Sequence, residues 1–178
     1  MNQKREVNVL YQVGIIAAFS TLAFIGTMII RIPIPVTGGY FNLGDTFVMA
    51  AALLYGPLVG GLVGMIGPAA ADAIGFPQFI LATAVVKGIE GLVVGLVGWK
   101  SRSGGWRQIA ALVAGVGILV SGYYVFEAFI YPAIAQFIPF FGVTDPKAAL
   151  AEIVPNLLQG VLSAVVAFAI CKVLKRSR

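Results

Sequence analysis

Long apolar runs, separated by short segments rich in proline, glycine or charge, follow one another along the chain. Four of these runs reach the ~20 residues that an α-helix needs to cross the hydrocarbon core of a bilayer. The other two are shorter and meet at a Gly56-Pro57 pair, which is typical of a tight turn. The pattern predicts an all-α integral membrane protein, a six-helix bundle in a single domain over residues 1–178, with spans at 9–30, 43–55, 58–74, 79–99, 109–131 and 150–174.

The composition supports a membrane protein. Sixty per cent of the residues are hydrophobic and 11% are charged, whereas a soluble domain carries about 25% charged residues. The first apolar run continues too far for the core of a cleavable signal peptide. The connection after it, RIPIPVTGG, contains two prolines and a glycine pair, and this composition predicts a loop.

The basic residues predict the orientation in the membrane. With six spans, nine of the twelve Lys and Arg residues fall on one side: Lys4, Arg5, Lys100, Arg102, Arg107, Lys172, Lys175, Arg176 and Arg178. Cytoplasmic loops carry an excess of Lys and Arg, so we expect both termini in the cytoplasm. This distribution explains the net charge of +5 without a nucleic-acid partner.

Polar side chains within or beside the apolar runs mark the candidate site, because such groups are costly in hydrocarbon and usually face a bundle interior or a cavity. In the predicted topology they gather in the outer half of the membrane, and the inner half is almost wholly apolar. Lys87, for example, is expected ~12 Å below the outer end of its helix. The polar set is Asn42, Asp45, Asp72, Lys87, Glu90, Glu127, Glu152, Asn156 and Gln159. Its placement indicates a wet pocket open to the outside.

Helical spacing refines this picture. Lys87 and Glu90 lie three residues apart, so they share a helix face and are placed to pair. Tyr123 and Glu127 also share a face, and Glu152 begins a third polar stripe. Two other interpretations stay open: the groups could serve only as a structural ion pair and as hydrogen bonds between helices, or they could line an ion path. An ion path would need polar groups in the inner half as well.

No sequence feature indicates catalysis. Histidine is absent, and the single cysteine, Cys171, excludes an internal disulfide and a cysteine metal cluster. The chain contains no phosphate-binding G-x-x-x-x-G-K-[ST] loop. We therefore expect no enzyme activity, no cofactor and no metal, and a transport function would need energy from a partner or from an ion gradient.

Four segments in series resemble the S component, the substrate-binding membrane subunit, of energy-coupling factor (ECF) vitamin transporters. They are GGYFNLGDTFVMAAALLYGPLVGGLVGMIG (38–67), VVKGIEGLVVGLVG (85–98), SGYYVFEAF (121–129) and EIVPNLLQGVLSAVV (152–166). The closest resemblance is to the branch with N-L-G-D, K-G-x-E-G and P-N-x-x-Q-G patterns. The resemblance implies six membrane helices in a bacterial or archaeal plasma membrane. It also implies a vitamin pocket that faces outward and is closed by the loop after the first helix.

The resemblance implies partners as well: an EcfT-type membrane coupling subunit and two cytoplasmic ATPase subunits, whose ATP hydrolysis is thought to topple the S component and release the vitamin inside. Family members usually dock through an A-x-x-x-A surface on the first helix. That strict pattern is absent here, and the nearest equivalent is Gly14-x-x-x-Ala18, with Ala17 and Thr21 beside it.

Combined with the resemblance, the residue pattern gives a set of expected roles. Substrate binding is expected of Tyr40, Asn42, Lys87, Glu90, Tyr123, Glu127, Asn156 and Gln159. A gate or structural role is expected of Asp45 and Asp72, with Asp45 capping the start of its helix.

The substrate class follows from the polar set. A pocket with a lysine, two glutamates, an asparagine and a glutamine suits a compact heteroaromatic compound, such as one that is pyridoxine-like or hydroxymethylpyrimidine-like. Riboflavin or another vitamin is the alternative. Two other classes of protein also stay open: a stand-alone secondary transporter, and a membrane assembly factor without a ligand.

Overall fold

A computed structural model describes residues 2–34, 39–101, 105–135, 137 and 146–176 of the protein. Most of these residues are helical, as the sequence predicts. Among the basic residues used to predict the orientation, Arg102 and Arg178 lie outside the described residues. The side chains of Lys4, Arg5, Lys175 and Arg176 are likewise not described.

Four helical segments are long and apolar enough to cross a membrane. The first is Val9–Ile29 within α1 (Asn2–Ile29), and the second is Pro77–Gly98, which joins η1 (Pro77–Phe79) to α4 (Ile80–Gly98). The third, Trp106–Ala135, joins α5 (Trp106–Val125), the π-helical turn η2 (Phe126–Ile130) and α6 (Tyr131–Ala135). The fourth, Ala149–Leu174, includes the end of α7 (Pro146–Ala151) and most of α8 (Ile153–Arg176).

The second and third predicted spans are shorter helices, α2 (Asp45–Tyr55) and α3 (Pro57–Asp72), with 11 and 16 residues. They are joined at Gly56, whose φ of 101° lies in the region that favours glycine. Pro57 then starts α3, where its fixed φ suits the first helical turn. Length and composition therefore support four spans directly, and the predicted count of six depends on how these two short helices sit in the bilayer.

Helix α2 forms the centre of the bundle. It contacts α1, α3, α4 and α8, and Met49 and Leu53 on it are completely buried. These side chains pack with Val94 of α4 and Leu112 of α5 in one apolar cluster. Away from the polar cluster, the described interior still contains polar side chains, such as Gln108 of α5 and Ser163 of α8, which are both completely buried.

Helices α3 and α4 pack at unusually close range. A Cβ atom added at Gly64 of α3 would stand 2.0 Å from the main-chain oxygen of Lys87 on α4. Small residues allow such close approach between membrane helices. This close packing therefore fixes the position of Lys87 along the axis of the bundle.

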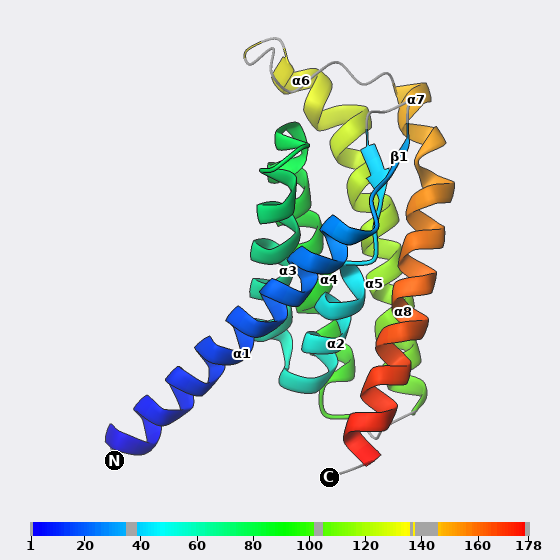
Figure 1. Ribbon diagram of the computed structural model, residues 1–178. Coiled ribbons are helices and arrows are strands. Elements are labelled where there is room, and N and C mark those ends of the chain that lie inside the picture. The colour runs from blue at the N-terminus through cyan, green and yellow to red at the C-terminus, as the bar shows by residue number, and fades with distance from the viewer. Residues whose placement is uncertain (1, 35–38, 102–104, 136, 138–145, 177–178) are drawn as a thin grey trace.

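The segment after α1 is a β-hairpin, whereas the sequence predicts only a loop. Strand β1 (Ile32–Ile34) pairs in antiparallel fashion with β2 (Gly39–Phe41), with Ile32 opposite Phe41. Strands this short carry too little alternation of polar and apolar residues to be recognised. Figure 1 shows the hairpin near α6 and α7, at the end of the bundle opposite both chain termini.

Candidate functional site

A buried ion pair lies at the centre of the polar cluster. Lys87 Nζ of α4 stands 2.6 Å from Asp45 Oδ1 of α2, and both side chains are almost completely buried. The other carboxylate oxygen, Asp45 Oδ2, accepts a hydrogen bond of 2.6 Å from Gln159 Nε2 of α8. Three helices are thus held together by one carboxylate. A buried charge pair of this kind is tolerated when further hydrogen bonds satisfy it.

Asn42 connects this ion pair to the end of the hairpin. Its main-chain N–H donates to Gln159 Oε1 at 2.8 Å, and its side-chain Nδ2 donates to the same oxygen at 3.2 Å. Its own Oδ1 accepts from Lys87 Nζ at 3.4 Å and from the main-chain N–H of Gly44 at 3.0 Å. The chain between β2 and α2 is therefore tied to α4 and α8 through one asparagine side chain.

The expectation that Asp45 caps α2 is wrong. The residue at the N-cap is Gly44, and no side-chain hydrogen bond caps this helix. The Asp45 carboxylate turns into the bundle instead, because Lys87 and Gln159 hold both of its oxygens there. The turn before α2 is stabilised by Asn42, whose side chain bonds a main-chain N–H two residues on, as asparagine commonly does in turns.

A small cavity lies between the hairpin and the neighbouring ends of the helices. Its volume is about 20 Å³, and it is lined by Gly39, Tyr40, Asn42, Phe79, Thr83, Tyr123, Glu152, Asn156 and Gln159. Five of the expected substrate-binding residues are in this list, and Lys87, Glu90 and Glu127 are not. Pockets for small molecules usually measure about 300–1,000 Å³, so this cavity is too small for a vitamin-sized molecule in the present arrangement.

Residues outside the cavity hold the hairpin in place. The Tyr40 hydroxyl of β2 donates a hydrogen bond to Asp72 at the end of α3. The guanidinium of Arg31 lies over the rings of Tyr40 and Phe76, at 4.8 and 5.1 Å from their centroids. The same guanidinium donates to the main-chain oxygen of Ala71 at 2.9 Å. Burial, reinforced by the negative charge of Asp72, raises the pKa of Tyr40 above its usual range, so its hydroxyl keeps its proton.

Removal of the Tyr40 hydroxyl tests whether its hydrogen bond to Asp72 holds the hairpin in place. Tyr40→Phe leaves the buried Asp72 without its hairpin donor, and a hydrogen bond to a charged group contributes ~1.5–3 kcal/mol. We expect the main-chain amides of the hairpin to exchange with deuterium at least tenfold faster, measured by hydrogen-exchange mass spectrometry. Tyr124→Phe, on α5 and outside the cavity, is the matched control and should leave these rates unchanged. Equal exchange in Tyr40→Phe and the unmodified protein would show that this hydrogen bond does not hold the hairpin in place.

Glu90 and Glu127, which were expected in the pocket, do not line the cavity. Lys87 pairs with Asp45 and not with Glu90, because Asp45 approaches it from the neighbouring helix. Glu90 is completely buried, and neither of its carboxylate oxygens has a hydrogen-bond partner in the described part of the chain. Glu127, on the π-helical turn η2, is also completely buried and interacts electrostatically with Glu152.

Some lining residues are missed by sequence reasoning. Thr83 shares a hydrogen bond of 2.7 Å with Tyr123, and Phe79 also lines the cavity. Thr83 lies one helical turn before Lys87 on the same face of α4, so its spacing from Lys87 was an available signal. Phe79 gave no signal, because an aromatic residue at the end of an apolar run usually indicates the membrane interface.

The predicted docking face of α1 is uncovered. Gly14, Ala17, Ala18 and Thr21 are all exposed, and a Cβ atom added at Gly14 would meet nothing within 4 Å. The Thr21 hydroxyl donates to the main-chain oxygen of Ala17 at 2.9 Å and so stays within its own helix. Figure 1 shows the N-terminal part of α1 diverging from the bundle. The face is therefore free to meet another membrane helix.

The chain is similar to known proteins over most of its length. The family model for the ECF-type riboflavin transporter S component matches residues 4–176. A protein of Pyrococcus woesei, described as an uncharacterized protein in the gap 3' region, is 35% identical over 150 residues, which cover 84% of this chain and 92% of that protein. The family match runs from α1 to α8 and so includes the hairpin and the whole polar cluster.

Proposed function

Because the chain belongs to the family of ECF-type riboflavin transporter S components, we propose that it captures a heteroaromatic vitamin or vitamin precursor beneath the β-hairpin. The family consists of substrate-binding subunits of transporters and not of enzymes. The observation that carries the proposal is the buried cluster of Asn42, Asp45, Lys87 and Gln159, which ties the hairpin to three helices.

We propose a multi-pass arrangement in a bacterial or archaeal plasma membrane with both termini in the cytoplasm. Six spans require α2 and α3 each to cross the membrane at the centre of the bundle, although both helices are short. The excess of Lys and Arg at the chain ends supports this orientation. The hairpin and the cavity lie at the other end of the bundle, which would then face outward (Figure 1).

Capture of the vitamin requires the hairpin to act as a gate. Opening breaks the hydrogen bonds from Asn42 to Gln159 and from Tyr40 to Asp72, and it exposes the polar lining of the cavity. A ligand that fills the enlarged cavity can accept and donate hydrogen bonds in place of those lost. Asp45 and Lys87 then form a rigid support beneath the ligand, because both residues lie on helices that keep their place when the hairpin moves.

Two kinds of ring compound fit this proposal. The family description favours riboflavin. A compact ring, pyridoxine-like or hydroxymethylpyrimidine-like, is favoured by the amide groups of Asn156 and Gln159 that line the cavity. Both kinds can stack on aromatic side chains such as Tyr123.

The proposed partners are a membrane coupling subunit and two cytoplasmic ATPase subunits, docked through the exposed face of α1. Gly14→Leu places a bulky side chain in this face, at a position where an added Cβ meets nothing within 4 Å. We expect at least a tenfold loss of the coupling module that co-purifies with the chain, with vitamin binding unchanged. Gly117→Leu is the matched control, because a Cβ at Gly117 of α5 also meets nothing within 4 Å. Equal loss in both variants would contradict docking through α1.

A transport assay tests the proposed class of protein. Liposomes that contain the chain together with its coupling subunit and ATPases should accumulate the vitamin only when ATP is supplied. Liposomes that contain the chain alone should show no uptake under a proton or sodium gradient. Uptake by the chain alone would identify a secondary transporter instead. A chain that neither binds nor transports a vitamin would be an assembly factor.

A further inference from the structure

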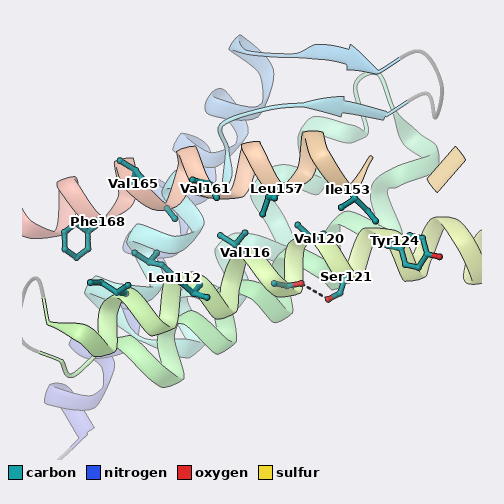
Figure 2. Close-up of a pocket in the computed structure, with 14 residues that line it drawn as sticks. Leu112, Val116, Val120, Ser121, Tyr124, Ile153, Leu157, Val161, Val165 and Phe168 are labelled. Atoms are coloured by element: carbon teal, nitrogen blue, oxygen red, sulfur yellow. Dashed lines mark hydrogen bonds between the residues drawn. The ribbon is translucent and has the colours of Figure 1, made fainter. Parts of the chain in front are cut away.

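A long apolar groove runs between α5 and α8, apart from the polar cluster. Its volume is about 840 Å³. Figure 2 shows Leu112, Val116 and Val120 of α5 facing Leu157 and Val161 of α8 across it. From Ile109 to Tyr124 the groove follows ~22 Å of helix at about 1.5 Å per residue.

The groove offers little to a polar ligand, because Ser121 and Tyr124 carry the only side-chain hydroxyls among its lining residues. Ser121 lines it, but the serine hydroxyl donates to the main-chain oxygen of Gly117 at 2.6 Å, as the dashed line in Figure 2 shows. Gly117 itself leaves space, because a Cβ added there would meet nothing within 4 Å. The other lining side chains are mostly aliphatic. A flexible hydrocarbon chain has the complementary chemistry.

One end of the groove has the chemistry of a lipid headgroup site. Lys172 lies one helical turn after Phe168 and continues the face of α8 that lines the groove. Its side chain is exposed and has no ion-pair partner among the described residues. Trp106 lies three residues before Ile109 on the matching face of α5, and its side chain is 77% exposed. Tryptophan rings favour the headgroup level of a bilayer.

We propose that this groove binds an anionic phospholipid, with one acyl chain between α5 and α8 and the headgroup at Lys172 and Trp106. A lysine near the membrane surface attracts anionic lipid by ~1 kcal/mol, which is about a fivefold preference. A partner helix suits the groove less well, because helices in lipid approach through small residues and the walls here are mainly branched side chains. The bound lipid holds α5 against α8, which carry Tyr123 and Gln159 of the cavity.

Tryptophan fluorescence tests the headgroup site. The chain has two tryptophans, so Trp99→Phe leaves Trp106 as the only reporter. This variant is placed in vesicles of phosphatidylcholine to which phosphatidylglycerol with brominated acyl chains is added. We expect quenching to show about a fivefold preference for phosphatidylglycerol over brominated phosphatidylcholine. The preference should fall to about one in Lys172→Gln and persist in Lys100→Gln, which removes an exposed charge two residues after the end of α4. Equal quenching by both lipids would overturn the proposal.

A groove-filling variant provides a second test that does not depend on charge. In native mass spectrometry we expect the unmodified protein and Gly14→Leu each to carry one bound phosphatidylglycerol. Gly117→Leu should have lost it. At both positions an added Cβ meets nothing within 4 Å, and thermal unfolding in detergent should confirm that both variants fold. If the unmodified protein holds no phospholipid and forms a dimer that Gly117→Leu separates, the groove is a protein interface and the proposal is wrong.

Discussion

Lys87→Met is expected to lower stability by about 3–5 kcal/mol, because it leaves the carboxylate of Asp45 buried without its charge partner. Affinity for the vitamin should fall at least tenfold, since Lys87 also holds the side chain of Asn42, which lines the cavity. Thermal unfolding in detergent and equilibrium titration measure the two effects. Assembly with the coupling subunit should persist in the protein that remains folded.

A double variant separates the two effects of this change. Lys87→Met with Asp45→Leu replaces the ion pair by apolar side chains of similar size, which is often neutral for stability. We expect stability to recover to within about 1–3 kcal/mol of that of the unmodified protein, because Gln159 Nε2 loses its buried acceptor on Asp45. Vitamin affinity should stay at least tenfold weaker. Lys100→Met, at an exposed position, is the matched control for the loss of a lysine. A double variant that binds as tightly as the unmodified protein would show that the ion pair has no part in the site.

Gly64→Ala is expected to lower stability by about 3 kcal/mol or more, the upper part of the range for overpacking a protein interior. The added Cβ would stand 2.0 Å from the main-chain oxygen of Lys87, and a main chain cannot turn aside as a flexible side chain can. Helices α3 and α4 must therefore separate, and the Lys87 side chain moves with α4. Thermal unfolding in detergent measures the loss.

The neighbouring Gly61 provides the control for this glycine. A Cβ there would stand 3.4 Å from the main-chain oxygen of Gly88, an ordinary contact distance. Gly61→Ala is therefore expected to be neutral or to stabilise by up to ~1 kcal/mol, because alanine favours a helix over glycine. A similar loss of stability in both variants would show that close packing at Gly64 does not hold the two helices together.

The helices and the members of the polar cluster could be predicted from the sequence because their signals are local. Apolar runs indicate membrane helices, and a polar residue within or beside such a run indicates a bundle interior or a cavity. Asn42, Asp45, Lys87 and Gln159 were all recognised in this way, and the structure brings them together.

The pairing within the cluster could not be predicted, because it depends on which helices pack together. Helical spacing favours Glu90 as the partner of Lys87, but Asp45 reaches the lysine from another helix. The hairpin escaped prediction because each strand has only three residues. The size of the cavity depends on how closely the hairpin packs onto α8, which no local pattern encodes.

Vitamin capture beneath the hairpin is tested most directly by titrating the purified protein with riboflavin, pyridoxine and hydroxymethylpyrimidine in a calorimeter. We expect one of them to bind at a 1:1 ratio with a Kd below about 1 μM, or roughly −8 kcal/mol. Its affinity should fall at least tenfold in Asn156→Leu, which removes an amide from the cavity lining. If none of the three compounds binds more tightly than the high micromolar range, and native mass spectrometry finds no other vitamin bound to the protein, capture at this site is contradicted.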